Sequence, residues 1–301
     1  MKKALPAGIL ASFFFAFTFI LNRSMHLGGG SWIWSACLRY YFTLPILALV
    51  LCFQGRDAFR RIFREIRRRP AAWLLWSTVG FGLFYAPLSY GSQYGEAWLT
   101  AATWQVTIVA GVLLTPLFGH RIPLRQLAWS AVILVGIFLL QSASAASLHA
   151  DGLARALLPI LLAAFCYPLG NRRLMQLCPP EISTPERVFG MTLCSMPFWL
   201  ALGAWGVGQA GLPSSGQVLQ SVGVALFSGV AATLLFFRAT DLVRRNPRQL
   251  AVIEATQSGE VVFSLLGGVL LLGDPLPGAL GLVGLGLIVG GMVGGSLSAA
   301  R

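Results

Sequence analysis

The stretch LPGALGLVGLGLIVGGMVGGSLSAA, residues 276–300, decides the fold class because it contains no charged side chain. A helix of about 20 apolar residues, rising about 1.5 Å per residue, spans the hydrocarbon core of a bilayer. Residues 4–21 and 261–273 are free of charge as well. A large soluble core could hold one such helix but hardly a whole series of them. The repeated blocks therefore indicate an integral membrane protein.

The composition of the whole chain agrees with this interpretation. Of the 301 residues, 56% are hydrophobic and only 11% are charged, whereas soluble domains carry about 25% charged residues. The net charge of +12 would indicate nucleic-acid binding in a soluble protein. Basic loops on one side of a membrane explain the charge better. We therefore expect the lipid bilayer and a small-molecule substrate as partners, and no nucleic acid.

The charge-free blocks and their short connections predict an all-α membrane protein with ten transmembrane helices. The spans are expected at residues 4–25, 31–53, 71–92, 97–118, 123–144, 152–175, 185–207, 217–240, 249–272 and 277–298. With both termini in the cytoplasm, all Lys and Arg residues except Arg23, Arg39 and Arg155 fall on the inner side. This asymmetry follows the positive-inside rule. It predicts a multi-pass inner-membrane protein with both termini cytoplasmic.

The charged connection at residues 54–70 has an amphipathic pattern. Phe59, Ile62, Phe63 and Ile66 recur at helical spacing opposite a face rich in arginine. This pattern predicts a helix that either lies on an anionic leaflet or serves only as an orientation signal.

The two halves of the chain resemble each other, which predicts repeats at 1–148 and 149–301. The segment 119–124 aligns with 273–278, and Asn22-Arg23 aligns with Asn171-Arg172. Because each half has five spans, the second repeat is expected to be inverted in the membrane. Inverted repeats are typical of alternating-access transporters. We expect a monomer with internal pseudo-symmetry.

The segment Leu272-Gly-Asp-Pro-Leu276, followed by Gly281, Leu287-Ile288 and Gly290-Gly291, resembles a hairpin motif of the drug/metabolite transporter superfamily. The ten-span layout resembles its EamA-type members, and the branch most similar is that of aromatic amino-acid and drug exporters. Asp274 stands where the motif has glutamate, and His120 stands there in the first half. The resemblance implies export of amino acids, metabolites or lipophilic cations, with spans one to four and six to nine around a central cavity.

The ninth expected span carries two carboxylates. Glu260 falls near mid-membrane, where a charged carboxylate facing lipid costs at least about 3 kcal/mol. It must therefore face a cavity, pair with a cation or stay protonated. It is a candidate for proton coupling or for binding a substrate amine, and the alternative is a structural hydrogen bond. Glu254 is a second coupling candidate, with a structural ion pair to Arg238 as its alternative.

Several other polar and aromatic residues are candidates for substrate binding. Arg39 has the planar, forked guanidinium that matches a carboxylate or phosphate, but it could equally pair with Glu260 or extend outward. Aromatic rings can stack on a substrate or hold an ammonium group, and ordinary packing is the alternative for each of them. The remaining candidates are Tyr85, Tyr90, Trp104, Gln105, Tyr167 and Gln257.

Glycines recur in the last span at Gly286, Gly290 and Gly294, with Gly291 and Gly295 beside them. Such spacing permits close approach of two helices. We expect it to pack the tenth span against the fifth.

The sequence favours a secondary transporter, an exporter of amino acids or similar metabolites. Nucleotide-binding, nucleophile-elbow and zinc-protease motifs are missing from the sequence, so we expect no enzyme activity, no metal site and no cofactor. An uncoupled facilitator of the same fold is the first alternative. A membrane-embedded lipid enzyme and a sensor or scaffold are further alternatives.

Overall fold

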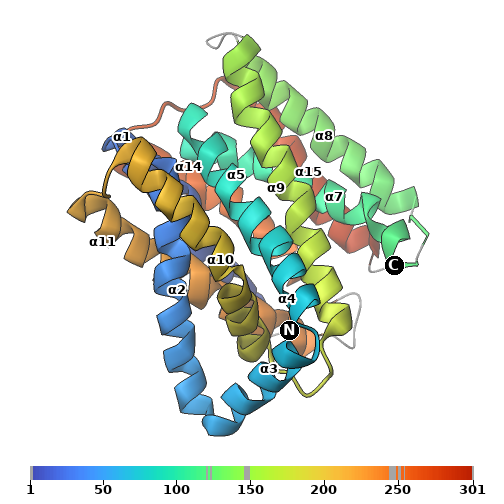
Figure 1. Cartoon of the computed structure of the whole chain (residues 1–301). Coiled ribbons are helices and arrows are strands. Elements are labelled where there is room, and N and C mark those ends of the chain that lie inside the picture. The colour runs from blue at the N-terminus through green and yellow to red at the C-terminus, as the bar shows by residue number, and fades with distance from the viewer. Residues whose placement is uncertain are drawn as a thin grey trace.

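The computed structural model describes residues 3–119, 121–122, 124–145, 150–243, 249, 252–253 and 255–299. Within these ranges every regular element is a helix, and the helices form one bundle (Figure 1). Eight helical segments are long and apolar enough to cross a membrane, and two shorter apolar segments cover Ala97–Leu113 and Thr256–Leu272. Each expected span overlaps one of these segments. The prediction of an all-α, multi-span membrane protein is confirmed.

The helices follow one another with short connections. The first part of the chain forms α1 Ala4–Leu27, α2 Trp32–Gln54, α3 Arg56–Arg68, α4 Pro70–Ser77, α5 Leu83–Gly91, α6 Ala97–Trp104, α7 Val106–Leu113 and α8 Leu124–Ala145. The second part forms α9 Ala150–Leu177, α10 Thr184–Ala210, α11 Ser215–Val224, α12 Thr233–Val243, α14 Gly259–Leu272 and α15 Ala279–Ala299. Short 3₁₀ or π segments are η1 Thr78–Gly82, η2 Ser92–Tyr94, η3 Thr115–Phe118, η4 Ala225–Ala232 and η5 Thr256–Ser258.

Four of the spans are irregular near their middle. The third span contains the π-helical segment η1 and the eighth contains the π-helical segment η4. The fourth span is broken at Gln105, between α6 and α7, and the ninth contains the 3₁₀ turn η5 directly before α14. Irregular backbone at membrane depth is tolerated where protein or a cavity surrounds it, and π segments are frequent at functional sites. The four irregular segments therefore indicate a functional site near the centre of the bundle.

The fifth and tenth spans, α8 and α15, lie side by side (Figure 1). The glycines of α15 that face α8 are Gly284, Gly291, Gly294 and Gly295. At Gly286 and Gly290, by contrast, an added Cβ would meet no described atom within 4 Å. The predicted packing of these two spans is confirmed, but the part assigned to Gly286 and Gly290 is wrong because they lie on another face of the helix.

The charged connection forms α3, the short helix at the bottom of Figure 1. Its apolar side packs on α10, with the ring centroids of Phe59 and Phe189 at 5.6 Å. Arg61 Nη2 lies 2.7 Å from the buried Glu186 carboxylate at the start of α10. The predicted helix is therefore present, and part of its apolar face contacts protein rather than lipid.

Candidate functional site

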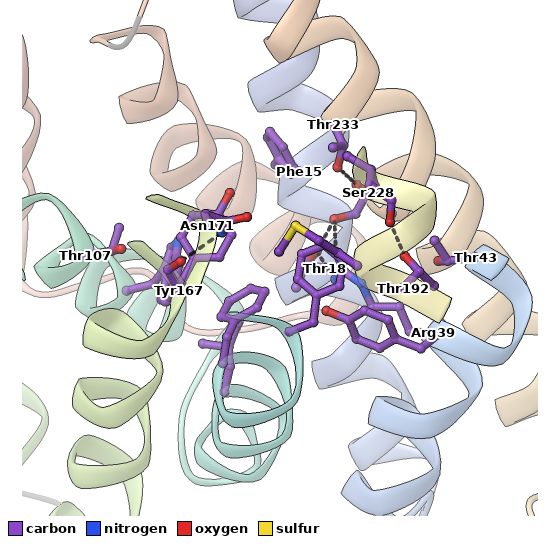
Figure 2. Close-up of a pocket in the computed structure, with 18 of the residues that line it drawn as sticks. Phe15, Thr18, Arg39, Thr43, Thr107, Tyr167, Asn171, Thr192, Ser228 and Thr233 are labelled. Atoms are coloured by element: carbon purple, nitrogen blue, oxygen red, sulfur yellow. Dashed lines mark hydrogen bonds between the residues drawn. The ribbon is translucent and has the colours of Figure 1, made fainter. Parts of the chain in front are cut away.

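The central cavity lies where the irregular spans meet. It has a volume of about 100 Å³ and is lined from α1, α2, η1, α5, α6, α7, α9, α10, η4, α12, η5 and α14. Figure 2 shows side chains from these elements converging on it. Of the residues singled out in the sequence, those that line it are Arg39, Trp104, Gln105, Tyr167, Gln257 and Glu260. Helices far apart in the chain thus contribute both charges and rings to one cavity.

Arg39 lines this cavity together with Arg187, and it is buried, with 7% of its surface exposed. Its guanidinium donates to Thr18 Oγ1 at 3.0 Å and to Ser228 Oγ at 3.2 Å, as Figure 2 illustrates. Among the described residues no carboxylate lies within 4 Å of it. Buried charges are normally paired, because leaving water is costly for an ion. Arg39 therefore keeps the capacity to bind an anion that enters the cavity.

Glu260 is the carboxylate of the same cavity, with 5% of its surface exposed. It lies in the first turn of α14 and interacts with the side-chain amide of Gln105 at the break in the fourth span. In the described part of the chain no Arg, Lys or His lies within 4 Å of it. The alternative that Arg39 and Glu260 form an ion pair with each other is therefore wrong. One cavity thus presents a guanidinium and a carboxyl group that remain apart.

Aromatic rings form much of the remaining wall. The ring centroids of Trp104 and Phe84 are 5.0 Å apart, and those of Trp104 and Tyr167 are 5.6 Å apart. Phe84 and Tyr167 are 4.7 Å apart. These three rings from the third, fourth and sixth spans make an apolar surface on which a flat or cationic group can lie.

Three candidates lie elsewhere. Tyr85 is fully buried behind the cavity, and its ring faces the guanidinium of Arg39 at 4.1 Å. Tyr90 lines a separate apolar groove on the side of the bundle, where its hydroxyl accepts from that of Tyr94 at 3.0 Å. Glu254 lies outside the described residues, so its expected ion pair with Arg238 is untested. The structure thus places Tyr85 next to the site and Tyr90 away from it.

The sequence interpretation missed the hydroxyl groups around Arg39. Besides Thr18 and Ser228, Thr43, Thr192 and Thr233 line the cavity, and Figure 2 shows them on the same side of it as Arg39. Ser and Thr are common in membrane helices as packing residues, so their positions alone gave no signal. Only the fold shows that they come from four different spans to line one cavity, where two of them accept from Arg39.

A second cavity of about 410 Å³ adjoins the first and shares five lining residues with it. The shared residues are Thr107, Tyr167, Asn171, Arg187 and Gln257. It extends along α7, the start of α8 and the end of α15. These parts lie toward the end of the bundle that carries α3, which we call the α3 end. The central cavity therefore continues toward the α3 end.

The opposite end of the bundle, at the turn after Leu27 and the loop 273–278, we call the hairpin end. There Arg23 Nε lies 3.5 Å from Asp274 Oδ1, and the backbone N–H of Ala97 donates to Asp274 Oδ2 at 3.1 Å. Trp98 Nε1 donates to the carbonyl of Pro275 at 3.2 Å. The loop of the sequence motif is thus tied to α1 and α6 at the hairpin end.

Comparison with known proteins agrees with a cavity inside a helical membrane bundle. Residues 2–301 match the EmrE family model, which is described as "Putative multidrug resistance efflux transporter". A relative from Bacillus subtilis (strain 168), "Uncharacterized protein YjlA", is 50% identical over 97% of this chain and 93% of its own length. Another, from Shouchella clausii, is an "Uncharacterized 42.1 kDa protein in intracellular alkaline protease 3'region"; it is 47% identical over 86% of this chain and 70% of its own. The chain belongs to the EmrE family, whose model carries the description "Putative multidrug resistance efflux transporter".

Proposed function

We propose that this protein is a secondary transporter that exports amino acids with aromatic or other apolar side chains. The observation that carries the proposal is the pair of separated charges in one cavity, Arg39 and Glu260. A free amino acid has a carboxylate for the guanidinium, an ammonium for the carboxyl group, and a side chain for the rings. A lipophilic cation would use Glu260 and the rings but would have to approach the buried charge of Arg39.

The transport cycle proposed is alternating access between two inverted repeats. The π segments η1 and η4 lie in the third and eighth spans, which the repeat pairs with each other. Gln105 in the fourth span and Glu260 in the ninth also occupy nearly equivalent positions of the two repeats. They are 155 residues apart in the sequence, one more than the 154 residues that separate the aligned hairpin loops. Discontinuous helices at corresponding positions of two repeats are typical of substrate sites in transporters. This correspondence supports a cavity on the pseudo-symmetry axis.

The orientation proposed places the α3 end and both termini in the cytoplasm of an inner membrane. The arginines of α3 then face the inner leaflet, as the positive-inside rule requires. The cavity that continues toward the α3 end would admit substrate from the cytoplasm, which is the loading state of an exporter.

The test is counterflow in proteoliposomes with phenylalanine and two analogues of the same size. Phenylalaninamide lacks the carboxylate, and 3-phenylpropionate lacks the amine. We expect saturable exchange of phenylalanine and weak competition by each analogue, since each leaves one buried charge without its partner. Tetraphenylphosphonium is the control for a cation exporter. Strong transport of the phosphonium with no exchange of phenylalanine would show that the amino-acid assignment is wrong.

A further inference from the structure

We propose that Arg23 and Asp274 form the latch that keeps the hairpin end shut while the cavity is open at the α3 end. The inference rests on the proposed function only in that it presumes alternating access. It assigns positioning residues that hold one conformation and do not touch the substrate. The carboxylate concerned belongs to the motif loop that links α14 to α15.

The latch joins three spans through one side chain. Asp274 has 6% of its surface exposed. One of its carboxylate oxygens lies 3.5 Å from Arg23 near the end of α1, and the other accepts from the N–H of Ala97 at the start of α6. A carboxylate at a helix N-terminus is stabilised by the unpaired N–H groups and the helix dipole. Opening this end must separate α1, α6 or the loop and must therefore break at least one of these interactions.

The geometry makes the ion pair the part of the latch that can be released. The side chain of Arg23 is 19% exposed, and its Nε has no hydrogen-bond partner among the described atoms. The contact with Asp274 is therefore a longer-range ion pair rather than a hydrogen bond. Such a pair is strong enough to bias two conformations and weak enough to break in each cycle.

The other end of the bundle has no matching carboxylate at this position of the sequence. The repeat aligns Arg23 with Arg172 and Asp274 with His120. Arg172 Nη1 donates to the carbonyl of Gly111 on α7 at 2.7 Å. Because the aligned loop position carries a carboxylate in the second repeat only, the Arg23–Asp274 pair favours closure of the hairpin end. The expected resting state is the one seen here, with the cavity reaching toward the α3 end.

The test measures access to the cavity from the hairpin end, independently of any substrate. Leu88 lines the cavity on α5, one turn before that helix ends at Gly91. Leu88→Cys is introduced into a variant that lacks the five native cysteines. Intact cells that carry it are treated with a membrane-impermeant maleimide, and the rate at which the new cysteine is labelled is measured. We expect slow labelling in this parent. Asp274→Asn keeps an acceptor for Ala97 but removes the charge, and Arg23→Gln removes the partner charge. Each should raise the labelling rate about tenfold, a population change that corresponds to about 1.4 kcal/mol.

Two controls separate the latch from general loosening. Arg23→Lys keeps the charge and should label as slowly as the parent. Asp57→Asn breaks the exposed pair of Asp57 with Arg60 on α3, and it should leave labelling unchanged. Rapid labelling of the parent, or unchanged labelling in Arg23→Gln and Asp274→Asn at normal membrane levels, would overturn the latch. If Asp274→Asn does not reach the membrane, the labelling rate of Arg23→Gln alone tests the latch. Because the assay uses no substrate, its result does not depend on whether the protein transports amino acids.

Discussion

The guanidinium carbon of Arg39 lies 4.1 Å from the centroid of the Tyr85 ring, and the hydroxyl of Tyr85 donates to Asn22 Oδ1 at 3.2 Å. A ring face attracts a cation without neutralising its charge. Tyr85 thereby holds Arg39 in place, while Asn22 fixes the ring. This arrangement stabilises a buried arginine and leaves it available to an anionic ligand, as a carboxylate partner would not.

The first prediction concerns Arg39. Arg39→Lys keeps the charge but loses the planar fork that can bind both oxygens of a carboxylate. Hydrogen bonds to charged groups contribute about 1.5–3 kcal/mol, so the apparent affinity for phenylalanine should fall at least about tenfold. Counterflow kinetics measure the effect, and Arg60→Lys on the exposed face of α3 is the control. An equal loss of apparent affinity for phenylalanine and for phenylalaninamide would mean that Arg39 does not bind the carboxylate of the substrate.

The second prediction concerns the aromatic wall. Trp104 is 7% exposed and contacts the rings of Phe84 and Tyr167. Trp104→Ala removes a stacking surface, which should cost about 1 kcal/mol or more, or about fivefold in apparent affinity. The control is Trp205→Ala on α10, where the side chain is 51% exposed. Unchanged transport kinetics at normal protein level would assign Trp104 to packing alone.

The third prediction concerns the stability of the α8–α15 pair. A Cβ on Gly284 would lie 2.7 Å from the carbonyl oxygen of Gly136, whereas one on Gly286 meets no described atom within 4 Å. Gly284→Leu should therefore destabilise the protein by about 1–3 kcal/mol through overpacking. The matched control Gly286→Leu should be close to neutral. Thermal unfolding in detergent compares the two, and equal losses would contradict the packing described here.

The sequence was sufficient to predict the helical spans because membrane helices need long apolar runs and their connections need charge. It could not place the irregular segments. The amino-acid sequence of Thr78–Gly82 or of Ala225–Ala232 does not by itself require a π-helix rather than an α-helix. The glycines of α15 show the same limit. Their spacing predicted a packing face, but the face that meets α8 depends on the rotation of the whole helix.

The sequence could predict those site residues whose charged side chains are energetically unfavourable inside an apolar membrane span. Arg39 and Glu260 are charges inside apolar spans, and such residues are expected to face a protein interior. Phe84 and the hydroxyls of Thr18 and Ser228 were not found, because rings and hydroxyls are ordinary in membrane helices. Tyr90 was placed in the cavity from its span alone. Its side chain instead points to the lateral groove, since the direction of a side chain around a helix follows from packing.

The fourth prediction concerns the orientation of the chain. Reporter fusions at the N-terminus, at residue 65 and at residue 301 should report the cytoplasm, and a fusion at residue 149 should report the outside. Residue 65 lies in α3, whose exposed arginines favour the inner side. A cytoplasmic signal at residue 149 would contradict the two inverted five-span repeats, because both halves would then begin on the same side.

The last prediction concerns Glu260 and the coupling of transport to protons. Glu260→Gln keeps the size of the side chain and its interaction with Gln105, but it cannot bind and release a proton. If Glu260 carries the coupling proton, the variant should lose uptake driven by an imposed pH gradient and keep phenylalanine exchange without a gradient. Both activities are measured in the same proteoliposomes. Because exchange needs only binding and alternation, it reports that the variant is folded.

Other outcomes of this experiment assign Glu260 differently. Loss of exchange together with driven uptake would favour direct contact with the substrate amine, and a larger loss for phenylalanine than for 3-phenylpropionate would identify that contact. Wild-type transport that ignores the pH gradient would mean an uncoupled facilitator of the same fold. A variant that still concentrates phenylalanine under the gradient would show that the coupling role is wrong, and the carboxyl group would then have a structural role beside Gln105 at the break in the fourth span.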